Sequence, residues 1–130
     1  MIVITFGTYD LLHVGHINLL ERAKKLGDRL IVGVSSDTLN YNKKQKHSIY
    51  NQDDRMKIIK SIRYVDEVFL EESLEKKKEY IQKYNCDILV MGDDWKGKFD
   101  DMPCKVIYLE RTKNISTTTN IQKINGDFAK

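Results

Sequence analysis

Two histidines stand close together near the N-terminus, in a stretch whose residue types suit phosphate chemistry. His13 and His16 are separated by Val14 and Gly15, and a helix pattern begins at about Gly15. A spacing of three places both imidazoles on one side of the first helical turn, where free backbone N–H groups and the helix dipole favour an anion. Two imidazole donors there can stabilise the negative charge that grows on a phosphoryl group in a transition state. The alternative is that both residues only cap the helix.

The residues just before the histidines fit a binding site as well. Gly7 directly follows an apolar run, and it permits a sharp turn with close approach of a ligand to the backbone. Asp10 can orient a divalent metal ion, directly or through water. It can equally cap the helix or fix His13, and the sequence leaves both interpretations open.

Two later segments carry related chemistry. Gly92 again follows an apolar run and permits close backbone approach, so the backbone of residues 92–99 can read the edge of a base. Trp95 can lie against a base, or it can pack into the core. Arg111 precedes a run of hydroxyl residues at an expected helix N-terminus, with Ser116 as the N-cap. Such a terminus suits the β- and γ-phosphates of a triphosphate.

Short apolar runs alternate with helix patterns along the whole chain. The runs lie at 2–6, 30–34, 65–70, 88–91 and 106–109. Continuous runs of this length are typical of strands covered on both faces. Helical spacing of apolar residues predicts helices around 17–26, 58–62 and 74–84, with a last helix after Ser116.

This alternation predicts the fold class and the place of the site. We expect an α/β fold, a Rossmann-like, doubly wound parallel five-stranded sheet with helices on both faces, in a single domain over residues 1–130. Ligands bind such sheets beyond the carboxyl ends of the strands, where the strand order reverses. Residues 7–16, 92–99 and 111–119 each follow a different strand, so they are expected to meet at one site.

The same three segments resemble known signatures. The run GTYDLLHVGH at 7–16 resembles the first signature of the cytidylyltransferase family, whose HxGH element is shared with other nucleotidyltransferases and class I aminoacyl-tRNA synthetases. The run MGDDWKGKFD at 91–100 resembles the segment that surrounds the nucleoside in bacterial members of that family. The run RTKNISTT at 111–118 resembles the second signature, RTxxISTT. The resemblance covers nearly the whole chain.

The resemblance implies an enzyme that transfers the cytidylyl group of CTP to a phosphorylated small alcohol. The expected acceptor is glycerol 3-phosphate, and the products are then CDP-glycerol and pyrophosphate. CDP-glycerol is a precursor for teichoic-acid-like or capsular polymers. The expected cofactor is Mg²⁺. Val14 and Glu110, beside the site, differ from residues that are common in the family. Three alternatives stay open: a cytidylyltransferase for another phosphorylated acceptor, an adenylyltransferase of the same fold, and a non-catalytic nucleotide-binding module.

The resemblance also implies a role for each matching residue. Charge stabilisation is expected from His13, His16, Arg111 and one lysine, Lys43 or Lys46, although a lysine cluster is usually solvated surface. The nucleotide pocket is expected to consist of Gly7, Thr8, Tyr9, Gly92, Asp94, Trp95, Thr112, Ser116 and Thr117. Arg63 and Asp66 are expected near the acceptor or a subunit interface, unless Arg63 only pairs with Asp66. Asp10 is the expected metal ligand, and the relatives imply a homodimer.

Bulk properties exclude several other classes. A net charge of +3 is too small to predict a nucleic-acid partner. No apolar run approaches the roughly 20 residues of a membrane span, and the first ten residues lack the features of a signal peptide. Cys86 and Cys104 are far apart in the sequence and not at a metal-ligand spacing, so they predict two free thiols in a reducing compartment. The expected location is therefore the cytoplasm.

Overall fold

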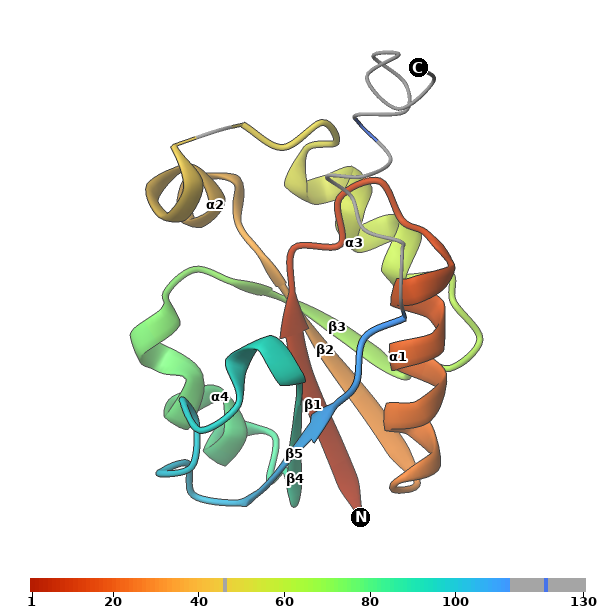
Figure 1. Cartoon of the computed structure of the whole chain (residues 1–130), viewed down its shortest axis with the longest axis vertical. Coiled ribbons are helices and arrows are strands. Elements are labelled where there is room, and N and C mark those ends of the chain that lie inside the picture. The colour runs from red at the N-terminus through yellow and green to blue at the C-terminus, as the bar shows by residue number, and fades with distance from the viewer. Residues whose placement is uncertain (46, 113–120, 122–130) are drawn as a thin grey trace.

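The computed structural model describes residues 1–45, 47–112 and 121 (Figure 1). Its strands are β1 (Ile2–Gly7), β2 (Arg29–Ser35), β3 (Glu67–Glu71), β4 (Ile88–Gly92) and β5 (Lys105–Leu109). Its helices are α1 (Val14–Lys25), α2 (Asp37–Lys44), α3 (Gln52–Lys60) and α4 (Lys77–Lys83), and two short 3₁₀ turns cover Leu74–Lys76 and Asp93–Trp95. Strands and helices alternate along the chain, as the sequence predicts.

The five strands form one sheet in which every neighbouring pair is parallel, in the order β3-β2-β1-β4-β5. From the central β1 the chain moves outward through β2 and β3, and it then returns to the other side of β1 for β4 and β5. The strand order therefore reverses between β1 and β4, and a ligand is expected beyond the carboxyl ends of these two strands. The predicted α/β fold with a doubly wound parallel sheet is confirmed.

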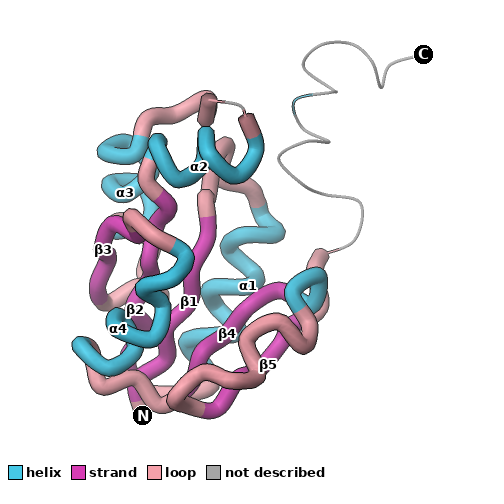
Figure 2. The backbone as a smooth tube through the Cα atoms, turned by 90° about the vertical axis from the view of Figure 1, so that its left-hand side faces the viewer, coloured by secondary structure: helices cyan, strands magenta, loops and turns pink. Residues whose placement is uncertain are grey.

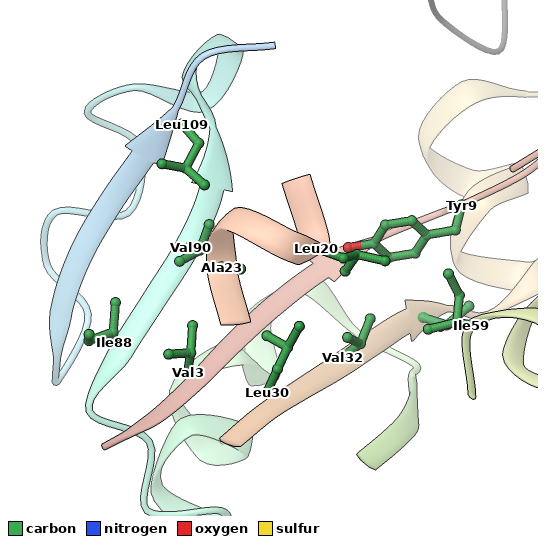
Figure 3. Close-up of a cluster of buried hydrophobic side chains, with 11 residues drawn as sticks. Val3, Tyr9, Leu20, Ala23, Leu30, Val32, Ile59, Ile88, Val90 and Leu109 are labelled. Atoms are coloured by element: carbon green, nitrogen blue, oxygen red, sulfur yellow. The ribbon is translucent and has the colours of Figure 1, made fainter. Parts of the chain in front are cut away.

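Successive strand residues point to opposite faces, and each face carries an apolar layer. On one face, α1 and α3 bury the side chains of Val3, Leu20, Ala23, Leu30, Val32, Ile59 and Val90 (Figure 3). On the other face, the buried layer of Ile4, Phe6, Ile31, Ile81, Leu89 and Met91 is covered by α4 and by side chains from residues 95–102. Figure 2 shows α4 in front of the sheet and α1 behind it.

The observed elements differ from the sequence prediction in three places. The apolar run at 65–70 begins its strand only at Glu67, because the residues before it form the turn that ends α3. The single helix expected around 74–84 consists of a 3₁₀ turn followed by α4. The helix α2 was not predicted, because its sequence DTLNYNKK has no apolar stripe. The helix expected after Ser116 lies outside the described residues.

Both cysteines are free thiols, as predicted. Cys86 is buried at the end of the α4 layer, and burial raises the pKa of its thiol to about 12. Burial also raises the pKa of the Cys104 thiol, so both groups are protonated and poorly nucleophilic near neutral pH. Within the described residues, no helix is long and apolar enough to cross a membrane.

Candidate active site

The two histidines form the N-terminal cap of α1. His13 is the N-cap residue, with φ −137° and ψ 176°, and its Nδ1 accepts the N–H of Gly15 at 3.1 Å. In return, Nδ1 of His16 accepts the backbone N–H of His13 at 3.1 Å. This is an imidazole version of the capping box, and it satisfies two N–H groups at the start of the helix.

These two hydrogen bonds determine the tautomer of both imidazoles. Because each Nδ1 accepts an N–H, the proton of the neutral ring must lie on Nε2. The rings of His13 and His16 stack, with centroids 3.8 Å apart and planes inclined by 23°. Capping and catalysis are therefore compatible, since Nδ1 caps the helix while Nε2–H is the group that each ring can donate to a ligand.

Both imidazoles are neutral near pH 7. Burial is the main cause that lowers the pKa of His16 to about 4, with His13 and Arg111 acting in the same direction and Asp10 against them. Burial, followed by the charge of Arg111, also lowers the pKa of His13. The pair can therefore offer two Nε2–H donors without first losing or gaining a proton.

The loop between β1 and α1 is supported by the ring of Tyr9. Tyr9 and Leu11 have positive φ angles of 54° and 48°, a backbone conformation that is costly for such residues and concentrates at functional sites. The Tyr9 ring is buried and lies edge-on to His16, with centroids 5.4 Å apart. A Cβ at Gly7 would come within 2.8 Å of this ring. Gly7 is therefore required by the packing of Tyr9, whereas the sequence suggested close approach of a ligand.

The burial of Tyr9 also changes its expected role. Its side chain belongs to the apolar layer under α1 (Figure 3), so it supports the histidines from below. A contact with the nucleotide would have to come from its backbone. Thr8, the neighbouring residue in the expected pocket, donates its Oγ1 hydrogen to Oδ1 of Asn40 at 3.1 Å.

Asp10 holds the segment that leads into α3. Its Oδ2 accepts the N–H of Ile49 at 2.7 Å, and its Oδ1 accepts the N–H of Tyr50 at 2.9 Å. The carboxylate is nearly buried, and both of its oxygens position residues 49–50 beside the histidine loop. Of the two interpretations from the sequence, the geometry supports a positioning role, directed at this segment and not at His13. Among the described residues, no three or more acidic, histidine or cysteine side chains form a group that could hold a metal ion.

Arg55 joins the backbone segments around the site, a role that no sequence pattern indicates. Its guanidinium is fully buried and pairs with Asp37 at 2.7 Å. It also donates to the carbonyl oxygens of Thr8 at 2.9 Å, Ser35 at 2.8 Å and Tyr50 at 3.0 Å. These bonds connect the loop after β1, the end of β2, the start of α2 and the residues before α3. Sequence reasoning missed Arg55 because a charged side chain is by default expected at the surface.

The ends of β4 and β5 meet beside the histidines. A Cβ at Gly92 would lie 2.6 Å from Oδ1 of Asp94 and 4.0 Å from Cγ of Arg111. Nη1 of Arg111 lies 3.9 Å from Oδ2 of Asp94, and both side chains are about half exposed. Since Arg111 is also close enough to lower the pKa of both histidines, the ends of β1, β4 and β5 converge as predicted.

A groove beside Arg111 lies between α1 and the end of β5. Its volume is about 240 Å³, and its lining residues are Asn18, Glu21, Arg22, Glu110, Arg111 and Thr112. Two hydrogen bonds cross it, one from Nδ2 of Asn18 to Oγ1 of Thr112 at 3.1 Å and one from Arg22 to the carbonyl oxygen of Glu110 at 2.9 Å. The helix α1 and the segment after β5 are thereby held together.

Trp95 packs against the layer covered by α4. Its ring lies 5.6 Å from the ring of Phe99, and Nζ of Lys98 lies 5.5 Å from the Trp95 ring centre. The indole is only partly buried. Trp95 therefore packs into the core, as in one of the two interpretations from the sequence. Part of its side chain remains at the surface of residues 92–99, the segment expected to contact the base.

The sequence matches the cytidylyltransferase-like family over residues 4–123. The chain belongs to this family. It is 53% identical to the glycerol-3-phosphate cytidylyltransferase of Bacillus subtilis (strain 168), covering 95% of this chain and 97% of the relative. It is 49% identical to the enzyme of the same name from Staphylococcus aureus (strain NCTC 8325 / PS 47), covering 98% of both chains. A similar solved structure is the lipopolysaccharide core biosynthesis protein of Thermoplasma volcanium GSS1, with a TM-score of 0.76, 27% identity, and 87% of this chain and 98% of that chain covered.

In this cytidylyltransferase-like protein, two residues expected near the acceptor lie at the edge of the sheet opposite the histidines. Arg63 and Asp66 precede β3, so they lie at the amino end of the parallel sheet, opposite the histidines. Asp66 pairs with Lys24, and it also accepts the N–H of Leu30 at 2.7 Å. The expected pairing of Arg63 with Asp66 is therefore replaced by Lys24, and neither residue reaches the site of its own chain.

Four expected site residues have little or no structural description. Lys43 lies in the last turn of α2, which follows the end of β2, and its side chain is not described. Lys46, Ser116 and Thr117 lie outside the described residues. The roles of Ser116 and Thr117 stay predictions from the second family signature, and that of Lys43 or Lys46 stays a prediction from a stretch where the resemblance is poor.

Proposed function

We propose that this cytidylyltransferase transfers the cytidylyl group of CTP to glycerol 3-phosphate, giving CDP-glycerol and pyrophosphate. The acceptor is assigned from three curated glycerol-3-phosphate cytidylyltransferases that are 49–54% identical over 89–98% of this chain. Relatives that act on other substrates by name, such as the FAD synthase of Pyrococcus abyssi (strain GE5 / Orsay), are less similar, at 34% identity.

One observation carries the reaction class: two neutral, tautomer-fixed imidazoles lie at the point where the strand order reverses. Phosphate monoesters are ionised near neutral pH, so the acceptor needs no strong general base. One oxygen of its phosphate attacks the α-phosphorus of CTP and forms the new P–O bond. The bond from the α-phosphorus to the β-phosphate oxygen breaks on the opposite side, and its electron pair leaves with pyrophosphate. No proton has to be transferred in this step.

Catalysis is then a matter of position and charge. We assign the Nε2–H groups of His13 and His16 to the non-bridging oxygens of the reacting phosphoryl group, where negative charge grows. The guanidinium of Arg111, beside them, is assigned to the phosphates of CTP together with the hydroxyls of Thr112, Ser116 and Thr117. Lys43 or Lys46, which follow β2 in the sequence, is assigned to phosphate charge as well.

We assign the base of CTP to the segment after β4. The absence of a Cβ at Gly92 allows Asp94 to lie close to the end of β4, and the backbone of the 3₁₀ turn Asp93–Trp95 follows at the edge of the sheet. Backbone groups in a fixed geometry can distinguish the amino group and O2 of cytosine from other bases. The exposed part of Trp95 would lie along the nucleoside.

The described residues do not build a magnesium cage of their own. Asp10, the residue expected to hold the ion, uses both oxygens on backbone amides of residues 49–50. We therefore propose that this chain would contribute few direct ligands to Mg²⁺ and that the ion would depend mainly on the triphosphate of CTP and on water, as is usual for this ion. When bound, it would neutralise part of the phosphate charge.

We further propose that the enzyme is a cytoplasmic homodimer. Two free thiols suit a reducing compartment. Arg63 is exposed at the end of the sheet remote from the histidines of its own chain, so it is placed for contact with a second copy. Sedimentation at micromolar concentration tests the assembly, and a 15.2 kDa species throughout would contradict it.

The experiment that tests the function combines two panels. Wild-type enzyme is incubated with Mg²⁺, glycerol 3-phosphate and each of CTP, ATP, GTP and UTP, and then with CTP and a series of other phosphorylated alcohols. Pyrophosphate release gives the rates, and mass spectrometry identifies the product. We expect strong preference for CTP and glycerol 3-phosphate, with CDP-glycerol as the product. Equal rates with ATP would refute the nucleotide assignment, and faster turnover of another acceptor would refute the acceptor.

A further inference from the structure

A buried asparagine at the carboxyl end of the sheet has no part in the mechanism above. Asn40 lies in the middle of α2, and only 1% of its surface is exposed. Its Oδ1 accepts the Oγ1 hydrogen of Thr8 at 3.1 Å, and its Nδ2 donates to Oγ of Ser48 at 3.0 Å. One side-chain amide therefore joins the loop after β1 to the segment that follows α2. Figure 1 shows α2 and the loop after β1 beyond the same end of the sheet.

A second contact lies next to the first. The rings of Tyr41 and His47 stack, with centroids 4.8 Å apart and planes inclined by 24°. The two contacts pair residue 40 with 48 and residue 41 with 47, so together they close the base of the short loop between them. We call the four side chains of Asn40, Tyr41, His47 and Ser48 the clasp. Inside it, the N–H of Gln45, the left-handed C-cap of α2, donates to the carbonyl oxygen of Tyr41 at 2.7 Å.

The loop closed by the clasp carries the lysines that are expected to bind phosphate. Lys43 and Lys46 both lie between Tyr41 and His47 in the sequence. A lysine is a compact charge on a long flexible stem, so its use in binding depends on where its backbone is held. Ordering a loop when the ligand binds costs affinity, and a loop that is fixed in advance avoids part of that cost.

The stability of α2 alone is a weak explanation for the clasp. The helix already has an N-cap at Ser36 and a left-handed C-cap at Gln45. Tyr41 and His47 are exposed, so their stacking buries little apolar surface. Asparagine is mostly found at the surface, whereas Asn40 is buried with both ends of its amide hydrogen-bonded. Such an amide holds two chain segments at a defined separation.

We propose that the clasp is a positioning element for phosphate binding. Asn40 holds the lysine-bearing loop at a fixed place beside Thr8, in the loop that leads to the histidines. Contacts a few residues further on support the same arrangement, because Asp10 and Arg55 bind the backbone of residues 49–50. The inference rests on the proposed function in taking a lysine of this loop as a phosphate ligand. None of the four clasp side chains touches the substrate in this account.

Four variants separate the contacts of the clasp. Ser48→Ala removes the hydroxyl that accepts from Asn40, and Ser48→Thr keeps a hydroxyl at this position. His47→Ala removes the ring stack at an exposed position. Asn42→Ala is the matched control, because it removes an asparagine side chain from the exposed surface of the same helix. Asn40→Ala is less informative, because it opens a buried space and can fail to fold for that reason.

The ligands are chosen to separate phosphate binding from binding of the nucleoside. Calorimetric titration with inorganic pyrophosphate and Mg²⁺ measures the affinity for the phosphates of CTP without turnover. KM for glycerol 3-phosphate reports on the phosphate of the acceptor. Cytidine carries no phosphate, and its inhibition constant against CTP reports on the nucleoside pocket alone.

We expect Ser48→Ala and His47→Ala to weaken phosphate binding about threefold to tenfold, the equivalent of one net hydrogen bond. A higher Kd for pyrophosphate would place the loop on the triphosphate, and a higher KM for glycerol 3-phosphate would place it on the acceptor. The inhibition constant of cytidine should not change in either variant. Ser48→Thr and Asn42→Ala should match wild type in all three measurements.

A cycle with the lysines tests how the clasp acts. In the variant Lys43→Met/Lys46→Met, phosphate binding is already weakened, and adding Ser48→Ala should have little further effect, because the clasp acts through these lysines. A further loss by the same factor as in the wild-type background would show that Ser48 acts by another route, and it would contradict the inference.

Two other results would overturn the inference. One is wild-type affinity for pyrophosphate together with wild-type KM for glycerol 3-phosphate in both Ser48→Ala and His47→Ala. The other is an equal loss of cytidine binding, because it would indicate a general distortion of the site. If the wild-type enzyme releases no pyrophosphate from CTP, the proposed function fails, and pyrophosphate titration of Ser48→Ala against Asn42→Ala still decides the role of the clasp. A wild-type protein that binds no pyrophosphate would contradict both proposals.

Discussion

Replacing His16 by asparagine separates the two tasks that the structure gives to this imidazole. Oδ1 of an asparagine can occupy nearly the position of Nδ1, so it can still accept the N–H of His13 that His16 accepts at 3.1 Å. No atom of asparagine reaches the position of Nε2. His16→Asn should therefore keep the helix cap and lose the catalytic donor, whereas His16→Ala should lose both.

The expected magnitudes follow from these contacts. Loss of one preorganised donor costs about 10²–10³ in turnover, or roughly 3–4 kcal/mol. Loss of a capping interaction costs about 1 kcal/mol of stability. Because the pKa of His16 is about 4, no charge is removed at pH 7 by either substitution. His16→Asn and His16→Ala should thus be equally slow, and only His16→Ala should unfold at lower denaturant.

Three measurements decide the outcome. Pyrophosphate release at saturating substrates gives kcat, calorimetric titration gives the Kd for CTP, and urea unfolding gives the stability. CTP should bind both variants within about tenfold of wild type, because the donor acts mainly on charge that appears in the transition state. Suppose that His16→Asn keeps more than about a tenth of wild-type turnover, where loss of a donor predicts 10²–10³. Then the histidine is only a cap, and the mechanism is wrong at its centre.

Four further predictions follow from the site. His13→Asn should lose turnover as His16→Asn does. The double variant should lose less than the product of the two effects, because both imidazoles act on one phosphoryl group. If the two losses multiply in pyrophosphate assays, this explanation is contradicted. The free energy of unfolding should fall as the pH falls from about 6.5 to 4, because the lowered pKa of His16 means that the unfolded chain binds the proton first. The contribution of His16 should be up to about 1.4 kcal/mol per pH unit. Urea unfolding at several pH values in this range should show a weaker pH dependence for His16→Asn than for wild type. Arg55→Lys should reduce the free energy of unfolding in urea by about 2–3 kcal/mol, because an ammonium group cannot replace the four hydrogen bonds that the buried guanidinium donates. The control Arg63→Lys, at the surface, should change it by less than about 0.5 kcal/mol. Asp10→Asn should lower the free energy of unfolding by about 1–3 kcal/mol, because one backbone amide of residues 49–50 loses its acceptor. The Mg²⁺ concentration that gives half the maximal rate should not change. A large increase in this concentration would show that Asp10 is a metal ligand.

The strands and the position of the site were predictable because they depend on local patterns. Each buried strand is a continuous apolar run, and parallel strands bring the residues that follow them to one edge of the sheet. His13 follows β1, Gly92 ends β4 and Arg111 follows β5, so their meeting follows from topology alone. The helix α2 escaped prediction because it has no apolar stripe. It is held by the N-cap of Ser36 and by the buried side chains of Leu39 and Asn40.

The supports of the site were not predictable, since they depend on partners far apart in the sequence. Arg55 binds carbonyl oxygens 47 and 20 residues away, and nothing near it in the chain marks it as buried. The same holds for Asp66. Its closeness in the sequence to Arg63 suggested an ion pair between the two, whereas in the fold Asp66 pairs with Lys24. Tyr9 looked like a ligand contact because it stands in a signature, but its positive φ turns the ring into the core.

The central claim is that the two imidazoles donate hydrogen bonds to a phosphoryl group that the acceptor attacks directly, and that they form no covalent bond to it. The stereochemical course at phosphorus tests this claim most directly. CTP carrying sulfur in one configuration at the α-phosphorus is converted with glycerol 3-phosphate, and the configuration of the product is determined by phosphorus NMR. A single in-line displacement predicts inversion. Retention would require two displacements through a covalent enzyme intermediate, and it would contradict the account.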